Sequence, residues 1–160
     1  MQARIEFTKV APEALRALFG LEAYVRHCGL EASLLDLVRV RASEINGCAY
    51  CVDMHTKEAR AHGESEQRLY AVAVWQETPF FTERERAALA WTDAVTLVHS
   101  SHVPDDVYQL ACQHFSEKEL IDLTMAIVSI NGWNRLVISS RQVPGTYQPS
   151  KEPTAAAAHA

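Results

Sequence analysis

Apolar residues recur along the first third of the chain with the spacing of amphipathic helices. Residues 13–30 and 31–45 both carry leucines and valines three or four positions apart, which is typical of helices with one buried face. The Asn46-Gly47 pair predicts an end or a bend there, because both residue types adopt left-handed conformations readily. A further helix is expected over residues 48–62.

The rest of the chain continues this periodicity, with clear signals for helix starts. A Ser or Thr followed three residues later by Glu forms a capping box, and two occur, Thr82 with Glu85 and Ser116 with Glu119. Helices are therefore expected over residues 65–76, 83–98, 105–115 and 117–142. No stretch alternates clearly as a strand would, so the expected fold class is all-α.

Length and composition place the chain among ordinary globular proteins. Its 160 residues, 48% apolar and 22% charged, fit one domain with a sizeable core. We expect this domain to span residues 1–143, and residues 144–160, rich in Pro and Ala, to form a loosely ordered tail.

Charge and hydropathy exclude several classes of function. The net charge of −5 argues against nucleic acid or an anionic membrane as the main partner, since both require a basic surface. No apolar run approaches the roughly 20 residues of a membrane span. The first residues lack the apolar stretch of a signal peptide, so a reducing cytoplasm is the expected location.

The stretch NGCAYCVDMH contains the candidate chemistry. In a helix, Cys48, Cys51 and His55 would share one face. The two cysteine Cα atoms would then lie about 5–6 Å apart, which a disulfide accepts. Closing so small a ring stabilises a fold by only about 2 kcal/mol, and structural disulfides seldom persist in the cytoplasm. Reversible redox chemistry is therefore the better interpretation, provided that both sulfurs are exposed.

Position and neighbours strengthen the redox interpretation. If the chain breaks at Asn46-Gly47, both cysteines lie in the first turn of a helix, where the dipole favours a thiolate. His55 is placed to transfer protons, and a carboxylate usually orients such an imidazole. Two candidates for that carboxylate lie on the preceding helix, Asp36 and Glu44.

The segment RASEINGCAYCVDMHTKEAR resembles the signature of AhpD-like alkylhydroperoxidases, within the carboxymuconolactone decarboxylase superfamily. That signature is Cys-x-x-Cys-x-x-x-His, with a Glu twelve residues before the first Cys. The later SINGWNRL is also similar to this family. The resemblance covers roughly residues 10–142 and implies a multi-helical, oligomeric AhpD-like bundle.

The resemblance also implies a role for each site residue. Cys51 would attack the peroxide, Cys48 would resolve the sulfenic acid into a disulfide, and His55 would relay protons. The Glu of the signature falls on Asp36, which is one methylene shorter, so Glu44 could substitute for it.

Partners follow from the same resemblance. The substrate would be a hydroperoxide, and the reductant a dithiol, a lipoyl-bearing protein or a thioredoxin-like protein. Homo-oligomers, trimers or hexamers, are implied, with no haem, flavin or metal.

Three alternatives remain open from the sequence. Cys48, Cys51 and His55, with His62 or a residue of a partner as the fourth ligand, could bind a metal in a regulatory module, although zinc sites usually draw ligands from two separate segments. The chain could be a carboxymuconolactone-decarboxylase-like lyase in which the cysteines are incidental. It could also be a binding protein without turnover.

Overall fold

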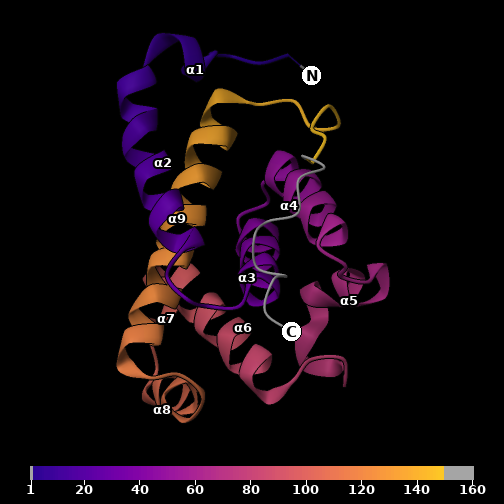
Figure 1. Ribbon diagram of the computed structural model, residues 1–160, viewed down its shortest axis with the longest axis vertical. Coiled ribbons are helices and arrows are strands. Elements are labelled where there is room, and N and C mark those ends of the chain that lie inside the picture. The colour runs from indigo at the N-terminus through magenta and orange to yellow at the C-terminus, as the bar shows by residue number, and fades with distance from the viewer. Residues whose placement is uncertain (1, 150–160) are drawn as a thin grey trace.

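The computed structural model describes residues 2–149, and within that range it contains helices and no strand (Figure 1). The elements are α1 (Phe7–Val10), α2 (Pro12–Arg26), α3 (Ala32–Ile45), α4 (Ala49–Ala61), α5 (Glu66–Ala71), η1 (Val72–Glu77), α6 (Glu83–Thr96), α7 (Val98–Ser101), α8 (Asp105–His114) and α9 (Glu117–Ser140). The predicted all-α class is confirmed. None of the helices in this range has the length and apolar character that crossing a bilayer requires.

The helix boundaries follow the local signals. Gly47 has a φ of 66°, and it separates α3 from α4, whose N-cap is Cys48. Both predicted capping boxes form, at the starts of α6 and α9. The two cysteines therefore lie at the start of a helix, as predicted.

The helix predicted over residues 65–76 is wrong in its second half. The α-helix ends at Ala71, and a 3₁₀ helix, η1, continues to Glu77. In an α-helix the carbonyl of Trp75 would accept the N–H of residue 79, but residue 79 is a proline and has none. That carbonyl accepts the N–H of Thr78 instead, at 3.4 Å, as in a 3₁₀ turn. The Arg86 guanidinium also donates to it, at 3.1 Å, and to the carbonyls of Gln76 and Thr78.

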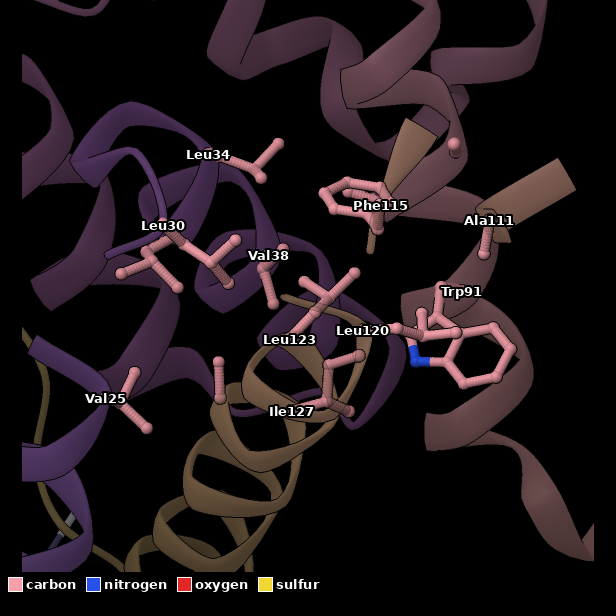
Figure 2. Close-up of a cluster of buried hydrophobic side chains, with 14 residues drawn as sticks. Val25, Leu30, Leu34, Val38, Trp91, Ala111, Phe115, Leu120, Leu123 and Ile127 are labelled. Atoms are coloured by element: carbon pink, nitrogen blue, oxygen red, sulfur yellow. The ribbon is translucent and has the colours of Figure 1, made fainter. Parts of the chain in front are cut away.

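Helix α3 lies at the centre of the fold and packs against α4, α6 and α9. Its apolar faces contribute to two clusters of buried side chains. The first cluster joins α3 to α2, α6, α8 and α9 (Figure 2); it includes Val25, Leu30, Leu34, Val38, Trp91, Ala111, Phe115, Leu120, Leu123 and Ile127. The second joins α3 to α4, α5, η1 and α6, through residues such as Leu37, Val40, Leu69 and Leu89.

A polar contact fixes the start of α4 over α9. The Asn46 amide donates to the side-chain oxygens of Asn131 and Asn134 at 3.0 and 2.9 Å. Asn134 is fully buried and donates in turn to Ser43 at 3.1 Å. Because buried amides are costly to leave unpaired, this contact holds the α3–α4 turn, and with it Cys48, in a defined place.

The segment 144–149, predicted as part of a loose tail, lies against α4 (Figure 1). The Gly145 N–H donates to Asp53 Oδ2 at 3.0 Å, and Lys57 Nζ donates to the Tyr147 carbonyl at 3.1 Å. The Tyr147 hydroxyl donates to Glu58 at 2.5 Å. We call residues 144–149 the C-terminal strap; the remainder of the predicted tail, from residue 150 onward, lies outside the described residues.

Candidate dithiol site

Cys48 and Cys51 form a disulfide at the N-terminus of α4, with their Cα atoms 5.3 Å apart. Cys48 is the N-cap, and Cys51 is the third residue of the helix. Backbone N–H groups in the first turn have no partner within the helix, and the helix dipole is positive there. On reduction, this position favours the thiolate form of a cysteine.

Both sulfurs are covered, which corrects the expectation that they would be exposed. Cys48 is 1% exposed and Cys51 2%, and they pack against Val137, Phe7 and Tyr50. Val137 comes from α9, but Phe7 belongs to α1, a four-residue helix with no buried residue of its own. On that side the cover is therefore a half-buried side chain of a short helix, an element of the kind that opens locally at low cost.

His55 lies one helical turn beyond Cys51 and is 7% exposed. Its Nδ1 is 2.9 Å from Glu58 Oε2, one turn further along the same helix. Among the described residues this is the ring's one hydrogen bond, so Nε2 is left to exchange a proton with a neighbouring group. The carboxylate that orients His55 thus comes from α4 itself.

The charges around Glu58 keep it ionised. Burial acts to raise its pKa, but the hydrogen bond and charge of His55, the Tyr147 hydroxyl and the nearby Arg39 outweigh burial and lower that pKa to about 2. Burial and the same carboxylate raise the pKa of the Tyr147 phenol. At neutral pH, therefore, Tyr147 remains a hydrogen-bond donor and Glu58 an acceptor.

Asp36 is bound to a different histidine from the one expected. It is 2% exposed, and its Oδ2 lies 2.7 Å from His62 Nδ1. Burial raises the pKa of Asp36, while His62 and Arg39 oppose that rise. The short aspartate side chain on α3 is thus engaged by the end of α4, and the expected contact between Asp36 and His55 is not formed.

Glu44 also lies away from His55. It is on the face of α3 that meets α6, 3.9 Å from Arg41, which itself binds Asp93. Glu44 Oε2 is buried and has no hydrogen-bond partner among residues 2–149. Burial, with the charge of Asp93 adding to it and Arg41 opposing it, raises the pKa of Glu44 to about 7.

The sequence analysis placed Cys48, Cys51 and His55 on one helix, but it did not identify Glu58 and Tyr147 as part of the site. A signal for Glu58 was available, because a residue three positions after a helical histidine lies beside it. No comparable signal existed for Tyr147, which is 89 positions from its partner. Within residues 2–149, no group of three His, Cys, Asp or Glu side chains is arranged to hold a metal ion.

A helical fold with Cys-x-x-Cys and a histidine at the start of one helix defines the AhpD-like class of proteins. The model of the carboxymuconolactone decarboxylase family matches residues 12–94, over half of the chain. The chain belongs to this family.

Three known proteins illustrate its relationships. The uncharacterized protein YdfG of Bacillus subtilis (strain 168) is 37% identical over 139 residues, which cover 87% of this chain and 95% of YdfG. A protein of unknown function from Agrobacterium tumefaciens, for which a role as the antioxidant defence protein AhpD has been suggested, is 45% identical. Its crystal structure matches with a TM-score of 0.86 over 93% of this chain and 99% of its own. The debrominase Bmp8 is similar in fold, with a TM-score of 0.78 at 21% identity over 87% of this chain and 75% of its own.

Proposed function

We propose that the protein is a thiol-dependent oxidoreductase that reduces hydroperoxides, alkyl hydroperoxides among them, through Cys51 and Cys48. The observation that carries the proposal is the bonded cysteine pair at the start of α4, with a carboxylate-paired imidazole one turn further on. Membership of the carboxymuconolactone decarboxylase family and the overall similarity to the Agrobacterium tumefaciens protein support it.

In the proposed cycle the reduced Cys51 first gives its proton to His55. The Cys51 thiolate attacks the terminal oxygen of the hydroperoxide, so that an S–O bond forms as the O–O bond breaks. His55 gives the proton to the departing alkoxide, which leaves as an alcohol. That proton matters because an alkoxide is a poor leaving group, and a positioned acid contributes about 100- to 10,000-fold.

The second half of the cycle closes the disulfide. Cys48 attacks the sulfenic sulfur of Cys51, forming the S–S bond and releasing the oxygen as water, with the Cys48 proton passing through His55. A dithiol, a lipoyl-bearing protein or a thioredoxin-like protein then reduces the disulfide and is itself oxidised. We propose the cytoplasm as the location, because its reducing poise supports such a cycle.

We also propose a homo-oligomer, a trimer or a hexamer. Helices α2 and α9 pack together and carry exposed large apolar side chains, including Phe19, Val128 and Ile138. These side chains support self-association, since exposed apolar surface is often an interface. Light scattering coupled to size-exclusion chromatography would measure the mass; a monomer at micromolar concentration would contradict this part of the proposal.

Consumption of tert-butyl hydroperoxide would test the activity, with dithiothreitol, dihydrolipoamide or thioredoxin as the reductant. We expect Cys51→Ser to abolish turnover. Cys48→Ser should stop after one equivalent, with a sulfenic acid at Cys51 that dimedone traps. Cys112→Ser is the matched control, because Cys112 is an exposed free thiol, and it should leave turnover unchanged. Unchanged turnover in Cys51→Ser would refute the mechanism.

A further inference from the structure

We propose that Tyr147 is a positioning residue of the dithiol site, and that the C-terminal strap is a working part of that site. Tyr147 would hold Glu58 in the geometry that orients His55 toward the sulfurs. This inference rests on the proposed function and deepens it, since it assigns a role to a segment far from the cysteines in sequence.

The geometry is a three-membered chain of side chains. The Tyr147 hydroxyl donates to Glu58 Oε1 at 2.5 Å, and His55 Nδ1 lies 2.9 Å from Glu58 Oε2. Each carboxylate oxygen therefore has its own partner on a different side of the group. A carboxylate held at both oxygens cannot turn about its terminal bond without breaking a charge-assisted hydrogen bond.

This arrangement matters because the imidazole has two tautomers. A fixed Glu58 oxygen at Nδ1 selects the tautomer with its proton on that nitrogen and leaves Nε2 to accept or give a proton. If Glu58 swings away, the second tautomer becomes populated and the ring loses its preferred orientation. Tyr147 thus acts on the reacting groups through Glu58 and His55, without contact with the substrate.

The strap is anchored by contacts that do not involve the Tyr147 hydroxyl. The Gly145 N–H donates to Asp53, and Lys57 donates to the Tyr147 carbonyl. Tyr147→Phe would therefore remove the hydroxyl and leave these two anchors in place. The variant tests the hydrogen bond to Glu58, separately from the docking of the strap.

Other charged groups also face Glu58, and they limit how far removal of the Tyr147 hydroxyl can change the ionisation of Glu58. Burial raises the pKa of Glu58, and His55 lowers it most, followed by Tyr147 and by Arg39 of α3; Glu58 in turn raises the pKa of Asp36 on α3. His55 and Arg39 both remain in Tyr147→Phe, so Glu58 stays ionised there at neutral pH. The expected defect is then one of orientation, and it should persist across the neutral pH range.

The experiment compares four variants of the full chain with the wild type. In Tyr147→Phe, we expect the rate of oxidation of the reduced protein by tert-butyl hydroperoxide to fall about tenfold, at the low end of what a positioned acid contributes. Tyr70→Phe is the matched control: it also removes a tyrosine-to-glutamate hydrogen bond, from Tyr70 to Glu66 at 3.1 Å on the exposed surface, and should oxidise at the wild-type rate. Glu58→Gln should lose more, and adding Tyr147→Phe to Glu58→Gln should cost nothing further, because both changes break the same chain.

A nitrogen-15 NMR spectrum of the His55 ring gives a readout that does not depend on turnover. We expect one tautomer in the wild type and in Tyr70→Phe, and a mixture in Tyr147→Phe. An unchanged oxidation rate in Tyr147→Phe, a single retained tautomer, or losses that multiply in the double variant would each overturn the inference. If the wild type consumes no peroxide, the proposed function fails, but the NMR comparison still decides whether Tyr147 positions His55.

Discussion

Glu44 provides a test of the structure that does not depend on the proposed activity. Its Oε2 is buried without a hydrogen-bond partner in the described part of the chain, and burial raises its pKa from 4.5 to about 7. Replacing it by Gln keeps the size of the side chain and removes the charge. We expect Glu44→Gln to stabilise the protein at pH 8 and to have little effect at pH 4.

The sign follows from the direction of the shift. A pKa raised in the folded state means that the unfolded chain ionises first as the pH rises. The wild type therefore loses stability progressively between about pH 4.5 and pH 7, and the loss is complete above pH 7. A pKa raised from 4.5 to about 7 corresponds to about 3 kcal/mol of lost stability, because each tenfold change in the proton equilibrium is worth about 1.36 kcal/mol. This value already includes the opposing attraction of Arg41.

Urea unfolding followed by circular dichroism at pH 4, 6 and 8 would measure the difference, with the disulfide kept oxidised throughout. Glu77→Gln is a suitable control, because Glu77 is exposed and its charge is hydrated in both states. The stabilisation by Glu44→Gln should grow from pH 4 to pH 8. An equal effect at both ends of that range, or a loss of stability at pH 8, would show that Glu44 is hydrated in solution.

Three further predictions concern the turn, the cover and the carboxylates. Gly47→Ala should lower the free energy of unfolding by about 1–2 kcal/mol, because a side chain is strained at a φ of 66°. Urea unfolding measures this change, and an unchanged free energy would show that the turn can adopt a backbone conformation without strain. Phe7→Ala should speed the reduction of the disulfide by dithiothreitol, as measured by mass spectrometry. Val10→Ala, which changes an exposed residue of the same helix, should not, and equal reduction rates in the two variants would contradict the role of Phe7 in covering the disulfide. Glu58→Gln should slow peroxide consumption more than Asp36→Asn, because Glu58 is the carboxylate bound to His55, and the reverse order would return that role to Asp36.

The parts of the fold that the sequence predicted are those with local causes. The capping boxes at Thr82 and Ser116 require only neighbouring residues, and Gly47 ends α3 because a left-handed residue is needed there. The same reasoning placed Cys48 and Cys51 at the start of a helix. It failed at η1, where Val74 leaves helical geometry and the distant Arg86 binds the carbonyls of Trp75 and Gln76.

The parts of the site that the sequence did not predict depend on contacts between distant segments. Asp36 was a reasonable partner for His55 until the fold placed His62 beside it. The cover by Phe7 and the approach of Tyr147 come from the two ends of the described chain, and neither end carries a periodic pattern that points to the dithiol. Helical periodicity reports which face of an element is buried, but it does not report which distant residue buries it.

The two ends of the chain also act on different sides of the dithiol. Phe7 of α1 packs against the cluster of Cys48, Cys51 and Val137, whereas Tyr147 of the C-terminal strap donates to Glu58, the carboxylate partner of His55. Displacing Phe7 would expose the disulfide to a reductant without breaking the hydrogen bonds from Tyr147 and His55 to Glu58. Access to the sulfurs and orientation of the proton-transferring group are therefore separable: Phe7→Ala should change the rate of disulfide reduction and leave the His55 tautomer unchanged, and Tyr147→Phe should do the reverse. A buried disulfide is thus compatible with redox cycling here, because one of the side chains packed against it, Phe7, belongs to a short helix with no buried residue of its own.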